Sequence, residues 1–454
     1  MTKEDGLLLA FYGDDFTGSA DAMESLSASG YRTVLFLETP TPEMIERFDG
    51  IRCIGVAGTS RAKRPADMEQ ELRPVFRRLA EMKVPIVHYK TCSTFDSSPE
   101  VGSIGRAIEV AREYFSGQEV IPLLAGAPPL GRYTLFGHHF ANIQHTVYRL
   151  DRHPVMSKHP ITPMGESDLR IHLGEQTSEY IGLMNILELD GSMDTVRERF
   201  KEKLGHPGIL LFDVLDDERL SVAGRLIWET AGDRSSFVVG SSGIGYALKS
   251  YWQSAGFEPG SHQKPVSVKP SDQVLAVSGS CSMVTRHQIE NALEQGFHGI
   301  KIPAEQIVKS GSTPRELLDQ AISLLQAGYS VIMYTAMGPD DESIAETRKH
   351  FNEMGMEDFQ SGEHIGGQLG RWMREIVLAT GVRRIIIAGG DTSGFVTRQL
   401  GVYGLEMMIP VSPGAPLCRA YSTDEKMNGM EVALKGGQLG SPDYFVKVRQ
   451  ASSI

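Results

Sequence analysis

The sequence predicts an α/β fold with two domains, each a mainly parallel sheet flanked by helices. The chain has 454 residues, 41% of them hydrophobic and 22% charged, so it is longer than one hydrophobic core usually serves. Short runs of Val, Ile and Leu alternate with amphipathic segments in both halves. Between the halves, "GFEPGSHQKPVSVKPSDQ" has three prolines, two glycines and little apolar periodicity. We therefore place one domain at residues 1–257, a linker at 258–273 and a second domain at 274–454.

The strands expected in the first half are "LLLAFYG", "TVLFL", "IRCIGVAG", "IVHYK", "VIPLLAG", "ILLFDV" and "FVVGS". Those expected in the second half are "VLAVSGS", "SVIMYT" and "RRIIIAGG". Apolar runs of this kind, bounded by glycine, are typical of buried parallel strands. Two helices have clear apolar stripes, one with Ala20, Met23 and Ser27 before Gly30, the other with Leu369, Met373, Ile376 and Val377 before Gly381.

The charge balance argues against nucleic acid as a partner. Lys and Arg total 45 and Asp and Glu total 57, which gives a net charge of −12, whereas phosphate neutralisation needs a basic face. The four cysteines are far apart and have no metal-ligand spacing, which favours a reduced cytoplasmic protein. The apolar run near the start is too short for a signal sequence, and no stretch approaches the ~20 residues of a membrane span.

The first candidate site lies in "LLLAFYGDDFTGSADAMESL", where a predicted strand leads into a predicted helix. One acid at a helix start is usually an N-cap, but Asp14 and Asp15 cannot both cap the same N–H groups. At least one is expected to face the crevice, where a carboxylate accepts hydrogen bonds from hydroxyls or contacts Mg²⁺. Thr17 and Asp21 follow in the same segment and could join this site.

The second candidate site follows the strand "IVHYK". Lys90 ends that strand, and Ser93 and Thr94 come next in a serine-rich loop. Arg61 and Arg132 lie in comparable turns. Hydroxyls with Lys and Arg suit a small carboxylate or a sugar acid, although a serine-rich loop can also be an ordinary loop. Metal binding by the adjacent pair His138 and His139 is not expected, because neighbouring residues point to different sides.

The glycines of "FVVGSSGIGYALKSY" have the order GxxGxG instead of the GxGxxG of a dinucleotide fingerprint. Close backbone packing at Gly240, Gly243 and Gly245 is the expected cause.

The last candidate site is divided among three glycine-rich turns of the second half. None of them matches a P-loop, but glycine allows backbone N–H groups to approach phosphate, and a following helix start favours the negative charge. Three such turns in one domain indicate a nucleotide site, with candidate residues Ser280, Ser282, Gly389, Gly390, Asp391, Thr392, Ser393, Gly394, Gly436 and Gly437.

These motifs resemble the four-carbon acid sugar kinases. "GDDFTGSAD" is similar to the DDxTGxxD signature of that family, and "GSCSMVTRHQ", "AGGDTSG", "PGAPLCRA" and "KGGQLGSPD" are similar to the ordered motifs of its nucleotide-binding domain. The resemblance covers nearly the whole chain. It implies an ATP-dependent kinase acting on a small sugar acid, with the acid in the first domain, ATP in the second, and the active site in the cleft between them.

One segment departs from the family pattern. The family reads roughly KKIDSTLRGN after the strand, and this chain reads "KTCSTFDSSPEVG", so Lys90, Ser93 and Thr94 align while an Asp and an Arg are missing. The exact acid therefore stays open, with 3-oxo and branched acids of four or five carbons included, among them that of the 3-oxo-isoapionate kinase branch.

On this basis we hypothesise a division of roles among the candidate residues. Asp14 and Asp15 would hold the acceptor hydroxyls, one of them as base or orienter. Arg61, Lys90 and Arg132 would neutralise the carboxylate of the acid. ATP phosphates would lie over residues 389–394, and Mg²⁺ would bridge them. The partners expected are therefore the acid and ATP, without nucleic acid or membrane, and a homodimer is left open.

Two alternatives remain at this point. A nicotinamide-dependent dehydrogenase of the same acid would use "VVGSSGIG" for the pyrophosphate, against which the glycine order argues. A non-catalytic sugar-acid-binding protein would keep the first site and tolerate loss of the second.

Overall fold

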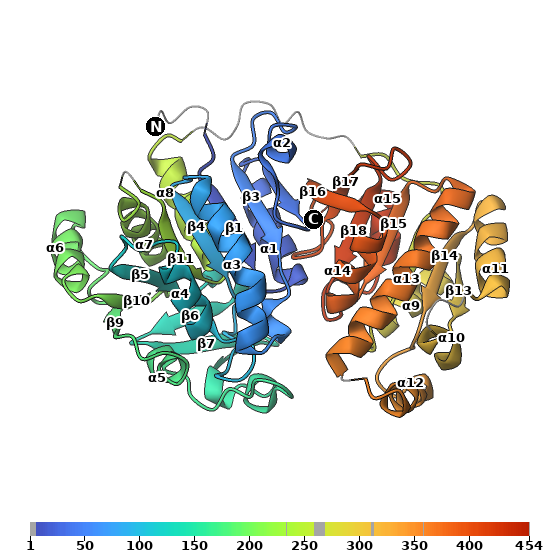
Figure 1. Ribbon diagram of the computed structural model, residues 1–454, viewed down its shortest axis with the longest axis horizontal. Coiled ribbons are helices and arrows are strands. Elements are labelled where there is room, and N and C mark those ends of the chain that lie inside the picture. The colour runs from blue at the N-terminus through green and yellow to red at the C-terminus, as the bar shows by residue number, and fades with distance from the viewer. Residues whose placement is uncertain (1–5, 233, 258–267, 310–312, 357, 454) are drawn as a thin grey trace. The chain divides into compact units, whose positions relative to one another are not determined.

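The computed structural model describes residues 6–232, 234–257, 268–309, 313–356 and 358–453 (Figure 1). The chain divides into two compact units, the first made of Met1–Thr33 and Thr39–His262 and the second of Val34–Glu38 and Gln263–Ile454. Most of the predicted linker, residues 258–267, lies outside the described residues. Both units are α/β, and the fold class expected from the apolar runs is confirmed.

The first unit has a wholly parallel sheet with the strand order β3-β1-β4-β11-β5-β10-β9. Most of its strands are fully buried, as continuous apolar runs predict. The strands are β1 (Leu9–Gly13), β3 (Cys53–Ala57), β4 (Ile86–Lys90), β5 (Val120–Leu124), β9 (Ile181–Met184), β10 (Gly208–Phe212) and β11 (Ser236–Gly240).

Helices α3 and α4 pack on each other, and α8 packs against α1 and α7 (Figure 1). The predicted stripe of Ala20, Met23 and Ser27 is buried on α1. The helices of this unit are α1 (Phe16–Ser27), α2 (Pro42–Ile45), α3 (Pro65–Glu81), α4 (Ile104–Arg112), α5 (Leu169–Gly174), α6 (Met193–Leu204), α7 (Asp217–Glu229) and α8 (Gly243–Ser254).

A small antiparallel sheet of β6 (Arg132–Leu135), β7 (His138–Ile143) and β8 (Thr146–Arg149) was not predicted. Its residues are only partly buried, so its sequence lacks the apolar runs of the main sheet. This sheet is relevant to the site because it carries Arg132 and His139.

Close packing requires Gly240 and Gly243 of the GxxGxG segment, as expected, but the same expectation is wrong for Gly245. A Cβ on Gly240 would lie 2.0 Å from the carbonyl oxygen of Leu124, and one on Gly243 would lie 2.0 Å from that of Gly126. A Cβ on Gly245 would make only an ordinary contact, 3.5 Å from Ser25 Oγ.

The second unit has a mixed sheet with the order β13-β14-β12-β15-β18-β17-β16-β2. The strands from β13 to β18 in this order are parallel, and β17, β16 and β2 continue the sheet in antiparallel pairs. Their bounds are β12 (Leu275–Ser278), β13 (Phe297–Lys301), β14 (Ser330–Tyr334), β15 (Arg384–Ala388), β16 (Val402–Ile409), β17 (Leu417–Ser422) and β18 (Glu431–Lys435).

Strand β2 (Thr33–Phe36) comes from the first part of the sequence. Its residues Val34, Leu35 and Phe36 pair with β16, and the N–H of Leu37 donates to the carbonyl of Tyr403 at 3.0 Å. The run "TVLFL" is buried, as its composition predicts. The segment Val34–Glu38 therefore completes the sheet of the second unit.

Among the helices of the second unit, α13 packs on α14 and on α11, and α9 packs on α15. The predicted stripe of α13 is confirmed, since Leu369, Met373, Ile376 and Val377 are buried. No helix within the described ranges is long and apolar enough to cross a membrane. The helices are α9 (Met283–Glu294), α10 (Ala304–Val308), α11 (Arg315–Gln326), α12 (Glu342–Glu353), α13 (Asp358–Thr380), α14 (Gly390–Gln399) and α15 (Tyr444–Gln450).

Candidate active site

Acidic and basic side chains meet at the carboxyl ends of three neighbouring strands in the first unit. Strand β1 lies between β3 and β4. Asp14 follows β1, the short 3-10 turn Ser60–Ala62 follows β3, and Lys90 ends β4. Because β3 and β4 lie on opposite sides of β1, this edge is a switch point of the sheet, where open α/β sheets bind ligands.

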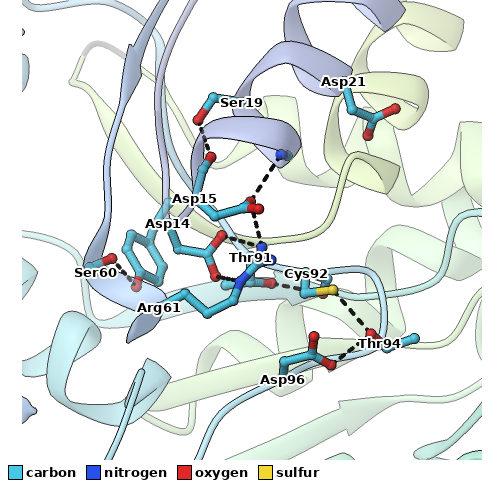
Figure 2. Close-up of polar contacts among 12 residues, drawn as sticks. Asp14, Asp15, Ser19, Asp21, Ser60, Arg61, Thr91, Cys92, Thr94 and Asp96 are labelled. Atoms are coloured by element: carbon cyan, nitrogen blue, oxygen red, sulfur yellow. Dashed lines mark hydrogen bonds and ion pairs between the residues drawn. The ribbon is translucent and has the colours of Figure 1, made fainter. Parts of the chain in front are cut away.

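Arg61 holds both aspartates of the opening motif (Figure 2). Its Nε and Nη2 donate to Oδ2 and Oδ1 of Asp14 at 3.0 and 2.6 Å, and Nη2 also lies 2.7 Å from Oδ1 of Asp15. The Asp14 side chain is buried, whereas that of Asp15 is 22% exposed. A bidentate Arg–carboxylate pair fixes orientation as well as charge. Asp14 thus orients Arg61, and Asp15 is the aspartate that a ligand can reach.

Asp15 also begins helix α1. Its Oδ1 accepts a hydrogen bond from the N–H of Gly18 at 2.9 Å, and its carbonyl accepts one from Ser19 Oγ at 2.6 Å. The two adjacent acids therefore share Arg61 but differ in their other contacts, because Asp15 also caps the helix and Asp14 is held by both Nε and Nη2 of the guanidinium.

Burial is the largest single influence on the pKa values of Asp14 and Arg61. It raises the pKa of the Asp14 carboxyl, and the charge of Arg61 opposes that rise. Burial acts to lower the pKa of Arg61, but Asp14 and Asp15 raise it well above its usual value. Arg61 therefore stays protonated at physiological pH.

Lys90 lies against the first turn of α1 and is 3% exposed. A Cβ on Gly18 would lie 2.2 Å from Lys90 Nζ and 2.4 Å from Asp15 Oδ1, so the ammonium and the carboxylate are close neighbours. The N–H of Asp14 donates to the carbonyl of Lys90 at 3.0 Å, which joins the two strand ends. The structure thus brings Asp14, Asp15, Arg61 and Lys90 together.

The loop after β4 places Ser93 and Thr94 beside a second acid that was not among the predicted residues. Thr94 Oγ1 donates to Asp96 Oδ1 at 2.7 Å and lies 3.0 Å from Cys92 Sγ (Figure 2). The Ser93 carbonyl lies 2.8 Å from His139 Nε2. Burial lowers the pKa of His139 to about 4, and its other ring nitrogen contacts a threonine hydroxyl. This neutral histidine holds the loop in place.

Arg132 is half-buried, and the hydrogen-bonding capacity of its guanidinium is not filled. Its Nη1 donates to three backbone carbonyls at 3.0 to 3.3 Å, but its Nε is buried without a partner among the described residues. Burial lowers the pKa of Arg132, and the neighbouring Cys92 and Asp96 oppose that shift. Cys92 also neighbours Arg61. A ligand carboxylate would satisfy the unpaired N–H.

Thr17 and Asp21 are placed differently along α1. Thr17 lies half-buried in its first turn. Asp21 accepts a hydrogen bond from Ser242 Oγ at the start of α8. Among the described residues no hydrogen bond or ion pair joins Asp21 to Asp14, Asp15 or Arg61, and Figure 2 shows its carboxylate directed away from their contacts.

Two helix N-termini meet at the glycine-rich turns of the second unit. Strands β12 and β15 are adjacent and parallel, and β14 lies on the other side of β12. Helix α9 follows β12 with Ser282 as N-cap, and α14 follows β15 with Gly389 as N-cap. Helix starts present free N–H groups and partial positive charge to an anion. The predicted nucleotide site thus also lies at a switch point.

The turn at Gly389 is tight. Its φ of +135° favours glycine, and its N–H donates to the Lys435 carbonyl at 3.0 Å. A Cβ on Gly279 would lie 2.6 Å from Thr392 Oγ1, so the turns after β12 and β15 are in contact. Ser393 Oγ donates to the Gly389 carbonyl at 2.6 Å. Gly390, Asp391 and Gly394 belong to α14, and the Asp391 side chain lies outside the described part of the chain.

Hydroxyl groups of α9 contact the turn after β18. Ser282 Oγ donates to the Gly437 carbonyl. Thr285 Oγ1 lies 3.0 Å from both the same carbonyl and Ser280 Oγ. The structure therefore brings Ser280, Ser282 and Gly437 together, with Gly436 in the same turn.

Lys435 is a candidate that the sequence predictions missed. It ends β18, is 1% exposed, and donates from Nζ to Thr285 Oγ1 at 2.9 Å. Burial lowers its pKa from 10.5 to about 7, and no carboxylate among the described residues offsets that effect. The signal was present in "EVALKGG", where a lysine closes an apolar strand before a glycine turn, as Lys90 closes "IVHYK".

No group of three or more His, Cys, Asp or Glu side chains suited to a metal ion occurs among the described residues.

Comparison with protein families matches residues 9–248 to the sugar-binding N-terminal domain and residues 275–445 to the nucleotide-binding C-terminal domain. The first match contains Asp14, Arg61, Lys90 and Arg132, and the second contains the glycine-rich turns and Lys435.

Individual relatives cover nearly the whole chain. A 3-oxo-isoapionate kinase from Paraburkholderia graminis is 44% identical over 448 residues, which are 98% of this chain and 94% of that one. A 3-oxo-tetronate kinase from Pseudomonas savastanoi pv. phaseolicola is 30% identical over 443 residues, with coverage of 97% and 96%. A crystal structure of a Haemophilus influenzae protein of the DUF1537 family has a TM-score of 0.74 at 23% identity, covers 98% and 100% of the two chains, and supports the fold.

Proposed function

The chain belongs to the family that combines a sugar-binding N-terminal domain with a nucleotide-binding C-terminal domain, and from this we propose that it is an ATP-dependent kinase that phosphorylates a hydroxyl of a small sugar acid. The first unit would bind the acid and the second ATP. The observation that carries the proposal is that each unit has its candidate residues at the switch point of its sheet, where α/β proteins bind ligands.

Asp15 is the better candidate for the group that contacts the acceptor hydroxyl. Its side chain is partly exposed, whereas both Asp14 oxygens are bound by Arg61. Asp15 would accept the hydroxyl proton or orient the hydroxyl for attack. Asp14 would act through Arg61 as a positioning residue.

The three cations of the first unit would bind the carboxylate of the acid. Arg132 has an unpaired N–H among its described surroundings, and Arg61 and Lys90 lie beside Asp15. Charge-assisted hydrogen bonds to a carboxylate are among the stronger polar contacts in proteins, so these residues would fix the acid relative to Asp15.

The start of α9, the start of α14 and Lys435 would bind the phosphates of ATP. Phosphoryl transfer asks a protein mainly for positioning and charge neutralisation. Two helix N-termini and one buried ammonium supply both at one edge of the sheet. Mg²⁺ would be held by the phosphates themselves and would neutralise charge on them.

The acceptor we propose first is a 3-oxo or branched sugar acid of four or five carbons. The support is the name of the 44% identical relative, a 3-oxo-isoapionate kinase, and of the 3-oxo-tetronate kinases below it. Asp96, with Thr94, adds a hydrogen-bond acceptor that could bind an additional hydroxyl of such an acid.

Two earlier alternatives are less well supported. In the segment that a dehydrogenase would use for pyrophosphate, Gly240 and Gly243 pack closely against backbone carbonyls, which accounts for these glycines without a dinucleotide. A non-catalytic binding protein would not need the hydrogen-bonded hydroxyls of Ser280 and Thr285 or the lysine Lys435 that donates to Thr285. The four cysteines form no disulfide with one another, which is compatible with action in the cytoplasm. A homodimer can be tested by light scattering.

The proposal is tested by measuring ADP release from ATP and Mg²⁺ in the presence of a panel of sugar acids. The panel includes 3-oxo-isoapionate, 3-oxo-tetronate, D-erythronate and D-threonate. We expect ADP release with at least one 3-oxo or branched acid, and the phosphorylated acid in the product by mass spectrometry. Absence of ADP release with every acid, together with absence of ATP binding, would refute the kinase function.

A further inference from the structure

The second unit has a cavity of about 310 Å³ beside the glycine-rich turns, lined by residues of α12, of α13 and of the turns after β12 and β14. We propose that this cavity binds the base and ribose of the nucleotide, in the orientation that leaves the phosphates over the starts of α9 and α14. The inference rests on the proposed kinase function and assigns a position to the nucleoside half of ATP.

The cavity adjoins the proposed phosphate site. Gly279 lines it, and a Cβ on Gly279 would lie 2.6 Å from Thr392 Oγ1 in the turn after β15. Cys281 also lines it and lies in the chain between Ser280 and Ser282, which contact the turn after β18. A ligand that extends from the cavity therefore passes directly onto the two helix N-termini.

The order of the strands gives the ligand a direction. The cavity lies at the ends of β14 and β12, and the proposed phosphate residues lie at the ends of β12, β15 and β18. A nucleotide placed with its nucleoside at β14 extends its phosphates along the sheet toward β18, where Lys435 is located. The reverse placement would leave the terminal phosphate away from Lys435.

The walls of the cavity suit a heterocyclic base. Ala336, Ile344, Phe351 and Ile365 supply apolar surface, and Phe351 is 3% exposed. Small-molecule sites of this kind are largely apolar, hold a few polar groups, and start at ~300 Å³. Thr347 provides a hydroxyl in the same wall.

Arg348 supplies a positive charge at the cavity, where the proposed ligand changes from its neutral nucleoside to its phosphates. Arg348 lines the cavity and is exposed on α12. Its positive charge opposes the rise that burial causes in the pKa of Cys281, so the guanidinium lies near the turn after β12. It is placed to contact the ribose or the first phosphate of a nucleotide whose base lies deeper.

The test uses a bulky residue that fills the cavity and a matched residue outside it. Thr347→Trp places an indole in the cavity, and Glu346→Trp places the same side chain one position earlier on α12, at an exposed residue that does not line it. Binding of ATP, adenosine and inorganic tripolyphosphate to the full-length protein is measured by calorimetry. Far-UV circular dichroism and thermal unfolding check the fold of both variants.

We expect Thr347→Trp to weaken ATP and adenosine at least tenfold while tripolyphosphate binds as in the wild type. Glu346→Trp is expected to bind all three ligands as the wild type does. Unchanged ATP affinity in a folded Thr347→Trp protein would overturn the assignment, as would equal losses for ATP and tripolyphosphate. If the wild type binds neither ATP nor tripolyphosphate, the kinase function itself is wrong and this inference falls with it.

Discussion

At the scale of single residues, the two aspartates of the opening motif differ in what surrounds them. Asp14 is buried under the guanidinium of Arg61, and Asp15 is partly exposed and caps α1. A substitution that removes the charge of Asp15 but keeps its capping ability separates chemistry from folding. Asparagine has that property, because its side-chain oxygen also caps helices.

We expect Asp15→Asn to lower kcat about 10²- to 10⁴-fold while thermal stability and ATP affinity stay near those of the wild type. Asp15→Ala is expected to lose the cap as well, at about 1 kcal/mol of unfolding free energy. Steady-state kinetics, calorimetry and urea unfolding measure these three quantities. Near-normal turnover by Asp15→Asn would show that the reacting hydroxyl is bound elsewhere.

Arg132 is expected to act on substrate affinity. Because its unpaired Nε–H is proposed to meet the carboxylate of the acid, Arg132→Met should raise KM for the acid about tenfold or more. The Kd for ATP should not change. A shift in ATP affinity equal to the shift in KM would contradict the assignment of Arg132 to the acid.

Lys435 makes folding depend on pH. Its pKa falls to about 7 in the folded protein from 10.5, so between these values the unfolded chain binds more protons than the folded chain. The free energy of unfolding therefore contains a contribution from Lys435 that rises with pH above about 7, by about 1 kcal/mol per pH unit. Urea unfolding of the wild type and of Lys435→Met at pH 7 and pH 9 measures it. An equal difference between the two proteins at both pH values would contradict the prediction.

The same lysine is expected to take up a proton when ATP binds. Near pH 8 the free protein holds Lys435 largely neutral, and a phosphate beside Nζ would favour its charged form. Calorimetry of ATP binding in HEPES and in Tris should give different enthalpies, corresponding to up to about one proton taken up. The difference should vanish in Lys435→Met, and its absence from the wild type would argue against a phosphate at Lys435.

At the scale of elements, glycines show how closely the helices of the first unit approach its sheet. Gly243 begins α8, and a Cβ there would lie 2.0 Å from the carbonyl oxygen of Gly126. We expect Gly243→Ala to lower the free energy of unfolding by about 2 kcal/mol or more, because a backbone atom cannot move aside easily. Gly174→Ala is the control. Gly174 ends α5 with open space around it, so the free energy of unfolding of Gly174→Ala should stay the same or rise by about 0.4–1 kcal/mol.

Elements with strong apolar periodicity could be predicted from the sequence, and those whose position depends on distant partners could not. Strand β4 agrees with its predicted range residue for residue, because "IVHYK" is an apolar run followed by polar residues. The sheet of β6, β7 and β8 was missed because its residues are only partly buried. Lys435 was missed because its burial depends on α9 and β15. No local sequence pattern indicates that these elements cover it.

The candidate site follows the same rule. Charged residues just after apolar strands can be recognised in the sequence, as with Asp14, Asp15 and Arg61. The structure does bring these three residues together. Asp21 lies on the same segment of sequence but binds Ser242, which is 221 positions away in the chain. Proximity in sequence could not reveal that contact.

At the scale of the whole molecule, β2 connects the two parts of the sequence. Val34–Glu38 belongs to the second unit although both neighbouring segments belong to the first. Without this strand, β16 would expose unpaired N–H and C=O groups along its edge, and such edges promote aggregation.

We therefore expect a fragment of residues 268–454 to aggregate or to fold poorly when expressed alone. A second fragment that carries residues 31–39 at its N-terminus through a flexible linker should be more soluble and should unfold cooperatively. Size-exclusion chromatography and thermal unfolding compare the two. A stable monomer from residues 268–454 alone would show that β2 is dispensable for the sheet.

The position of β2 also limits how this gene can be recombined with those of its relatives. In the sequence, a crossover near residue 260 falls between the two halves of the chain. It would nevertheless pair Val34, Leu35 and Phe36 of one parent with Gly404, Leu405 and Glu406 of another. A chimera should therefore take residues 33–38 and the second half of the chain from the same parent. Module boundaries drawn from contacts would then serve directed evolution better than boundaries drawn along the sequence.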